Sequence, residues 1–266
     1  YEALVSAAIA DRPDVIFMAG DLLPHRWSSL GRASSFIDRF RSCVDRVRSA
    51  SGGSVPRIVV ILGNDDERAA EPAFLDGDRR GDWDYIHQRT VAIGDLVVAG
   101  YSHVPPTPFL IKDWERYDVG RYVDPGCVAP DAGYRTVEVD PDVIDTQTIA
   151  SDLDRLTADT DGRRLILLTH APPYRTALDR ADLDGQMIDH APLDVHVGSV
   201  ALRRIIESRQ PLLTLHGHIH ESARLTGSWR DRIGRTHCFT AAHDGPELAL
   251  VRFDLDDLDS ATRELI

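Results

Sequence analysis

Four short, continuously apolar segments constrain the fold of this chain more than any other feature of its sequence. They are residues 14–19, 57–62, 164–169 and 211–215. Runs of this length without polar alternation are typical of strands that are covered on both faces. A stretch that could form a helix precedes each run. The sequence therefore predicts an α/β fold whose central strands lie in the interior.

Residues able to bind metal ions follow each of the four segments directly. They are Gly20-Asp21, Gly63-Asn64-Asp65-Asp66, His170, and the run His216-Gly217-His218-Ile219-His220. Side chains at the carboxyl ends of buried strands lie where α/β sheets place their chemistry. Neutral imidazole is the commonest side-chain donor to transition metals. A surface loop that happens to be rich in histidine would explain the last motif alone, but not four matching strand ends.

This ordered set of motifs, from residue 14 to about 221, resembles the calcineurin-like metallophosphoesterase superfamily. The resemblance implies a four-layer α-β-β-α sandwich with two mixed β-sheets, formed by a single domain over residues 1–266. It also implies a metal-dependent phosphoric ester hydrolase, either a phosphatase or a phosphodiesterase. Such an enzyme hydrolyses a phosphomonoester or phosphodiester with hydroxide that two metal ions activate.

By the same resemblance, the carboxylate of Asp21 bridges two divalent ions. Asn64, His170 and His218 bind the second ion, and His220 binds the first. We expect Asn64 and His170 to take part in catalysis as well. Asp, Asn and His donors accept Mn²⁺, Fe, Zn, Ni or Co, of which we expect Mn²⁺.

The sequence departs from the family pattern in two places. No Asp-x-His motif precedes Asp21 on an opening strand, and we infer that the strand carrying it is missing from this sequence. If the motif is truly lost, the alternative function is a catalytically impaired scaffold that binds and does not hydrolyse. Asp65 also stands where many members have a histidine that protonates the leaving group. Asp65 is therefore our candidate for that acid, or else a structural residue. A metallo-β-lactamase-like hydrolase is a weaker alternative, because its His-x-His-x-Asp-His run is absent.

Two features could contribute to substrate binding. Arg175, five residues after His170, is a candidate phosphate clamp. The proline-rich stretch 101–127 resists regular structure, and its aromatic and basic residues would suit a lid over the site. Alternatively, Phe109 and Trp114 are simply packed against the edge of a sheet.

The composition excludes several other classes. No apolar run approaches the 18 residues of a membrane span, and the net charge of −13 argues against an extended nucleic-acid-binding surface. Cys43, Cys127 and Cys238 are far apart and odd in number, as is typical of reduced thiols in a cytoplasmic protein. We therefore expect a cytoplasmic enzyme that acts on a small-molecule phosphoester or a phosphoprotein.

Apolar periodicity and turn residues predict the remaining elements. We expect helices at 31–50, 141–160 and 200–208 (the last capped by Ser199), a hairpin at 91–98, and closing strands at 236–241 and 248–255. His25 could support the metal site from outside, and His216 is expected to lie outside the set of ligands. The other histidines are expected at the surface or in the core with satisfied hydrogen bonds; they are His87, His103, His190, His196, His237 and His243.

Overall fold

The structure is a computed structural model that describes residues 1–23, 30–50 and 56–266. Its α-helices are α1 (Glu2–Asp11), α2 (Leu30–Ala50), α3 (Glu71–Arg80), α4 (Pro141–Thr146), α5 (Ile149–Thr157), α6 (Val200–Arg209) and α7 (Ser222–Thr226). Two short 3₁₀ helices, η1 (Arg68–Ala70) and η2 (Gly162–Arg164), complete the described helical structure. No described helix has the length and apolar character needed to cross a membrane.

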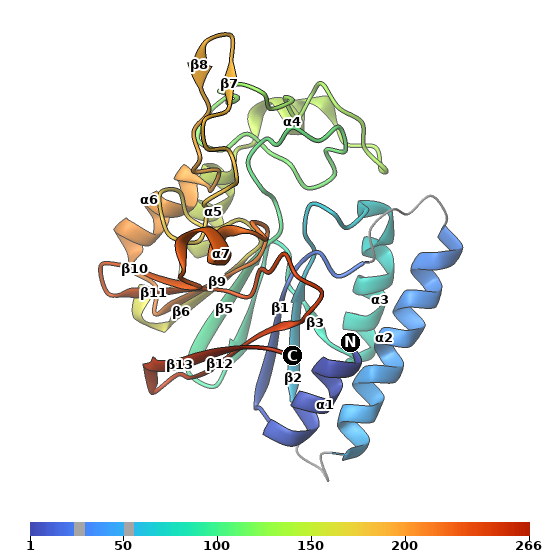
Figure 1. Cartoon of the computed structure of the whole chain (residues 1–266). Helices are drawn as coiled ribbons and strands as arrows, with labels where there is room; N and C mark the ends of the chain where they lie inside the picture. Colours follow the sequence, from blue (N-terminus) through green and yellow to red (C-terminus); the bar gives the residue numbers. More distant parts are fainter. Residues whose placement is uncertain (24–29, 51–55) are drawn as a thin grey trace.

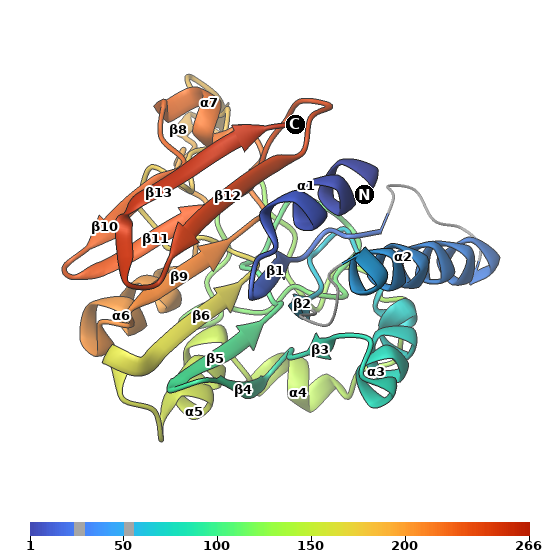
Figure 2. The same ribbon diagram turned by 90° about the horizontal axis from the view of Figure 1, so that it is seen from below.

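Two main sheets form the centre of the molecule (Figure 1). The first is parallel and has the order β1-β2-β3, from β1 (Val15–Ala19), β2 (Arg57–Ile61) and β3 (Asp84–Tyr85). The second is mixed and has the order β10-β11-β9-β6-β5-β4. Its strands are β4 (Arg89–Ile93), β5 (Leu96–Tyr101), β6 (Leu165–Thr169), β9 (Leu213–His216), β10 (Arg230–Ile233) and β11 (Thr236–Thr240). Helices α1, α2 and α3 cover the outer face of the first sheet, and α5 and α6 cover that of the second (Figure 2).

The alternation of side chains along the strands creates three separate apolar cores. In β2, Val60 faces α2 and α3, whereas Val59 and Ile61 face the second sheet. In β6, Leu167 packs against α5 and α6, whereas Ile166 faces the first sheet. Both faces of these strands are therefore covered, which explains why their sequences are continuously apolar and confirms the predicted four-layer sandwich.

A C-terminal hairpin closes the core between the two sheets. It consists of β12 (Ala249–Asp254) and β13 (Asp257–Leu265), which pair antiparallel. The ring of Phe253 lies 6.2 Å from that of Phe17 in β1 and 5.9 Å from that of Phe239 in β11, measured between centroids. The predicted closing strand at 248–255 is thus correct, but sequence reasoning missed its partner β13.

The other predicted elements are confirmed, with one exception. The helix expected at 31–50 is α2, and the hairpin at 91–98 is the β4–β5 pair. Ser199 accepts a hydrogen bond from the Leu202 N–H at the start of α6, as a helix cap should. The single helix predicted at 141–160 is wrong. It is divided into α4 and α5, because Gln147 is extended and Thr148 begins a new helix with a capping box.

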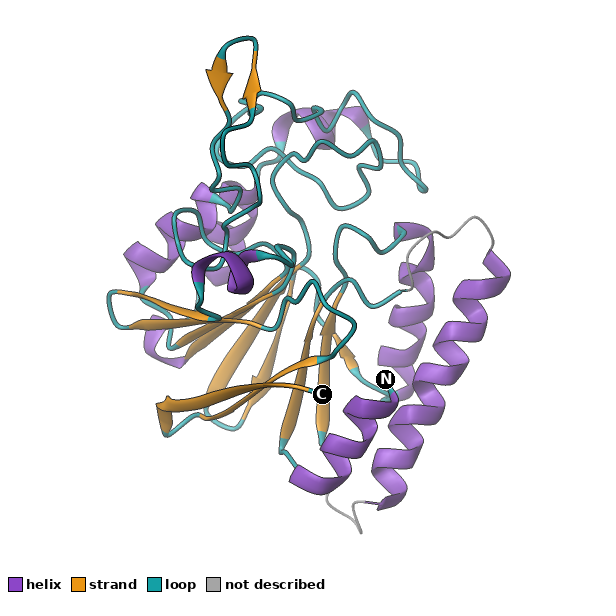
Figure 3. Ribbon diagram, viewed as in Figure 1, coloured by secondary structure: helices purple, strands orange, loops and turns teal. Residues whose placement is uncertain are grey.

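The stretch between β5 and α4 has no regular helix or strand, as its prolines predict. Together with the small hairpin β7 (Met187–Ile188) and β8 (Ala191–Pro192), it extends beyond the ends of the two sheets (Figure 3). Trp114 is fully buried and donates from Nε1 to the Asp66 carbonyl at 2.7 Å. Phe109 is 59% exposed. Trp114 is therefore a packed residue, and Phe109 remains accessible to solvent.

The only lysine of the chain lies in a buried ion pair within this stretch. Lys112 is fully buried, and its Nζ lies 2.5 Å from Glu115 and donates to the Thr107 carbonyl at 3.0 Å. Removing one partner of such a pair leaves the other charge buried without compensation, which is far costlier than losing an exposed pair.

We predict that Lys112→Met lowers the free energy of unfolding by about 3–5 kcal/mol, measured by urea denaturation. Methionine has a similar length, so the loss of stability would come from the unpaired charge of Glu115 and not from a cavity. Arg46→Gln is the matched control, because it breaks the exposed pair with Glu2 and should leave the midpoint nearly unchanged. Equal effects of the two variants would contradict the prediction.

Candidate functional site

The predicted metal-binding residues lie at the carboxyl ends of four strands from both sheets. Asp21 follows β1 and Asn64 follows β2, in the first sheet, whereas His170 follows β6 and His218 and His220 follow β9, in the second. All four strands end on the same side of the sandwich (Figure 1). The fold therefore brings together side chains that are up to 199 positions apart in the sequence, from Asp21 to His220.

His170 is the centre of this cluster and is completely buried. Its Nδ1 lies 2.6 Å from the Ala19 carbonyl, which can only accept, so Nδ1 carries the proton. Its Nε2 lies 3.1 Å from Asp21 Oδ2 and 3.0 Å from Asn64 Oδ1. The imidazole of His170, which follows the second sheet, is thus fixed by the backbone of the first sheet. It faces one side-chain oxygen atom of Asp21 and one of Asn64.

Asp21 is held as a carboxylate by its neighbours. Burial alone would raise its pKa, but the charge and hydrogen bond of His170, with further bonds from His220 and the Asp65 N–H, hold the pKa of Asp21 well below its usual range. His220 Nε2 lies 3.8 Å from Asp21 Oδ2. Conversely, burial and the charge of His170 lower the pKa of His218 to about 3, so that its imidazole is neutral.

The backbone around the cluster requires glycine. A Cβ atom on Gly63 would lie 2.3 Å from Asp21 Oδ1 and 2.5 Å from His170 Cε1. Asp21 and His218 themselves have positive φ angles of 53° and 72°, a strained conformation for non-glycine residues. Such strain is characteristic of functional sites, where the surrounding structure compensates for its cost.

The donor atoms fit divalent cations in their chemistry. With Nδ1 protonated, His170 Nε2 faces the oxygens of Asp21 and Asn64, so a second proton or a metal cation must lie between them. Without a metal ion the second proton meets this need, because Asp21 raises the pKa of His170 despite burial. A histidine whose other nitrogen donates to a backbone carbonyl is the usual metal-binding arrangement. Within residues 1–23, 30–50 and 56–266, no three His, Cys, Asp or Glu side chains form a preassembled metal-binding group. The fit therefore rests on the types of donors and on their orientation toward one another.

Asp66 organises the loops of the site, a role that the sequence did not predict. Its carboxyl group is fully buried and accepts hydrogen bonds from three backbone N–H groups, those of Leu22, Leu23 and Gly63, at 3.2, 2.7 and 2.9 Å. Burial, with the nearby charge of Asp21, raises the pKa of Asp66 to about 7. It therefore ties the loop after β1 to the loop after β2. It lies before η1 and does not cap a helix.

The other residues that the sequence suggested for the site differ in their relation to this cluster. Asp65 belongs to it, because its Oδ1 accepts from Asn64 Nδ2 at 3.0 Å and its N–H donates to Asp21 at 2.9 Å.

Arg175 is exposed and its guanidinium lies over the ring of Tyr174, 5.2 Å from the centroid. His216 is buried, with Nδ1 2.9 Å from Thr169 Oγ1, so it supports the strand ends. His25 lies outside the described residues.

His103 corrects one expectation from the sequence. We expected it at the surface or in the core with satisfied hydrogen bonds. It is instead 3% exposed, and its Nδ1 has no hydrogen-bond partner.

Comparison with known proteins identifies the family. Residues 1–222 match the calcineurin-like phosphoesterases. The chain belongs to this family. Its membership confirms the resemblance drawn from the strand-end motifs and supports a phosphoesterase type of function.

Individual relatives add information on the fold only. A 76-residue stretch is 40% identical to the uncharacterized protein MJ1162 of Methanocaldococcus jannaschii and covers 28% of this chain and 29% of that protein. The crystal structure of TT1561 of Thermus thermophilus is similar with a TM-score of 0.56 at 14% identity, over 99% of this chain and 91% of that one. Another solved structure is similar with a TM-score of 0.57 at 15% identity, over 99% of this chain and 92% of that one.

We predict that Asp66→Asn destabilises the protein by about 1–3 kcal/mol, because the amide group must leave at least one of the three buried N–H groups without an acceptor. Urea denaturation would measure the loss. Asp38→Asn, an exposed position on α2, serves as the control and should leave stability unchanged. An unaltered midpoint for Asp66→Asn would mean that the carboxylate does not hold the two loops.

Proposed function

We propose that this phosphoesterase binds two divalent ions, Mn²⁺ first among them, and hydrolyses a phosphomonoester or phosphodiester. Asp21, Asn64, His170, His218 and His220 would hold the ions. The observation that carries this proposal is the position of His170 Nε2, within 3.1 Å of both the Asp21 carboxylate and the Asn64 carbonyl oxygen. A cation that took the place of the proton on Nε2 would meet three donor atoms from the two sheets.

Divalent ions in such a site polarise phosphoryl oxygens and acidify water enough for it to attack phosphorus near neutral pH. The protein's own contribution is to fix the donors in advance. Asp21 supplies the negative charge, and its low pKa keeps it ionised over the physiological range. The backbone bond from His170 Nδ1 to Ala19 fixes the tautomer and the orientation of the ring.

Asp65 is our candidate for protonating the leaving oxygen. It follows Asn64 directly, and its carboxylate shares a hydrogen bond with that side chain. Such a carboxyl group suits substrates whose leaving group is already a weak base. Arg175, which lies exposed on Tyr174, remains a candidate for contacting the substrate phosphate from the surface. The substrate class that we propose is a small-molecule phosphoester or a phosphoprotein.

The direct test is hydrolysis of bis-p-nitrophenyl phosphate and p-nitrophenyl phosphate by chelator-treated protein, with and without added Mn²⁺. The assay should use residues 1–266 beside any longer form that the gene encodes, because by resemblance the first ion of the family site requires an Asp-x-His motif. We expect Mn²⁺-dependent hydrolysis. Metal binding without hydrolysis in either protein would instead favour the scaffold alternative.

We also predict that Asp21→Asn reduces kcat/KM for the better of the two substrates by at least about 100-fold, since altering even the outer partners of metal ligands costs 10–100-fold. The control is His190→Gln, which changes an exposed histidine in the β7–β8 connection. Circular dichroism should confirm that both variants are folded. Wild-type activity in folded Asp21→Asn would contradict the proposed role of this carboxylate.

A further inference from the structure

A second polar pocket lies beside the irregular stretch that follows β5. Its outer part is a cleft of about 450 Å³, whose lining includes Arg68, Arg116, Gln147 and Val143 and the acidic residues Glu71 and Glu138. An inner recess of about 10 Å³ shares Arg68, Arg116 and Val143 with the cleft and is also lined by Arg135 and His103. A space of this size holds roughly one water molecule or one oxygen atom of a ligand.

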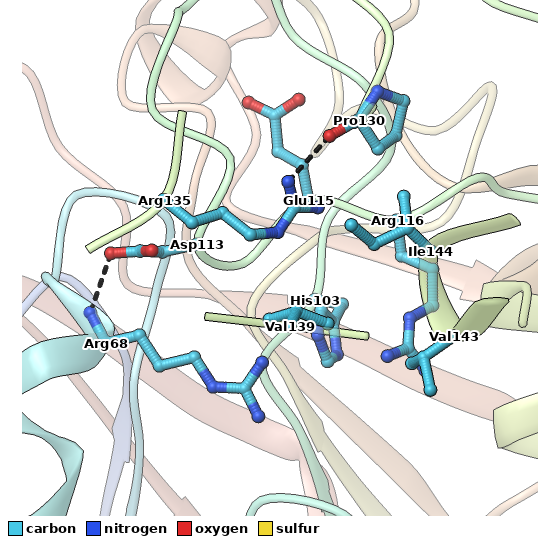
Figure 4. A pocket seen from close by; sticks show the side chains of 10 residues that line it. All are labelled: Arg68, His103, Asp113, Glu115, Arg116, Pro130, Arg135, Val139, Val143 and Ile144. Carbon is cyan, nitrogen blue, oxygen red and sulfur yellow. Dashed lines mark hydrogen bonds between the residues drawn. The ribbon is translucent and has the colours of Figure 1, made fainter. Parts of the chain in front are cut away.

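Three arginines line this recess (Figure 4). Arg68 belongs to η1, and Arg116 and Arg135 belong to the stretch between β5 and α4. Arg135 donates to the Pro130 carbonyl at 2.6 Å, and among the described residues no carboxylate lies within ion-pair distance of it. Burial lowers the pKa of Arg135, and the charges of Asp113 and Glu115 act in the opposite direction.

The two acidic residues in the recess are already engaged elsewhere. Asp113 accepts from the backbone N–H groups of Arg68 and Thr136, each at 2.8 Å, and from the Thr136 hydroxyl. Glu115 is paired with the buried Lys112. Arg68 and Arg116 have carboxylate partners of their own, because Arg68 Nε lies 3.3 Å from Glu71 and Arg116 Nη1 pairs with Asp152. Each keeps further N–H groups, since a guanidinium has five donors.

His103 supplies a polar atom without a partner at the same place. Burial lowers its pKa well below the usual range, and the charges of Arg116, Arg68 and Arg135 contribute to the shift. The imidazole is thus neutral, and in one tautomer its Nδ1–H is a donor. In that tautomer the buried donor lacks an acceptor, which an oxygen atom of a ligand would supply.

We propose that this pocket binds a small oxyanion of the phosphate type, with one oxygen in the recess and the others on the guanidinium groups. Arginine recognises such groups through paired, charge-assisted hydrogen bonds. The site goes beyond the proposed phosphoesterase function and is separate from the metal cluster. Trp114 lies between them, bonded to the Asp66 carbonyl on one side and covered by Arg68, 5.1 Å from its ring centroid.

The test is isothermal titration of inorganic phosphate into the whole chain in the presence of a chelator, which excludes phosphate held by metal ions. We expect one binding site per chain. Arg135→Gln should weaken binding at least tenfold, as expected for one lost hydrogen bond to a charged group. Arg121→Gln, a change at an exposed arginine of the same stretch outside the pocket, should not.

A second variant and a spectroscopic signal keep the test decisive. Val143→Asp places a carboxylate at the pocket while keeping all three arginines, and it should also abolish binding. Phosphate should shift the ¹⁵N signal of His103 Nδ1, assigned with His103→Gln. Binding that neither Arg135→Gln nor Val143→Asp weakens, or no binding at all, would overturn the proposal.

Two further arms identify the source of the anion and separate this site from the metal cluster. Tighter binding of phenyl phosphate than of inorganic phosphate would assign the outer cleft to the organic part of a phosphorylated ligand, and equal binding would point to free phosphate. Asp21→Asn should leave the chelator-resistant binding intact. A loss of phosphate binding in folded Asp21→Asn would place the anion at the metal cluster and contradict a second site.

Discussion

The contact between His170 and the end of the first sheet is the interaction on which the rest of the site depends. One imidazole from β6 reaches the Ala19 carbonyl through Nδ1 and the Asp21 and Asn64 side chains through Nε2. Since His170 is fully buried, these contacts cannot be replaced by water. The two sheets must therefore meet at a fixed distance at this edge, and the apolar core between them maintains that distance along the strands.

The placement of polar groups follows from the same constraint. Loops at strand ends cannot be buried unless their backbone groups find partners. Asp66 meets this need for three N–H groups between the first two strands. Beneath the long stretch after β5, the pair of Lys112 and Glu115 and the contacts of Asp113 do the same. His103 in the arginine pocket differs, because among the described residues its buried Nδ1 has no hydrogen-bond partner.

Much of this fold could be predicted from the sequence because its signals are local. The strands covered on both faces appear as continuous apolar runs, and the residues Asp21, Asn64, His170, His218 and His220 follow them directly. The break between α4 and α5 was missed because a capping box at Thr148 competes with apolar periodicity that continues across it. The roles of Asp66 and His103 could not be predicted, since each depends on segments distant in the sequence that surround it.

The binding of two metal ions is tested most directly by anomalous diffraction at the manganese edge from crystals of the protein grown with Mn²⁺. The account predicts one anomalous peak among Asp21, Asn64, His170 and His218, and a second one next to Asp21 and His220. Density for manganese only elsewhere, or ordered side chains at Asp21 and His170 with no ion between them at saturating Mn²⁺, would contradict it.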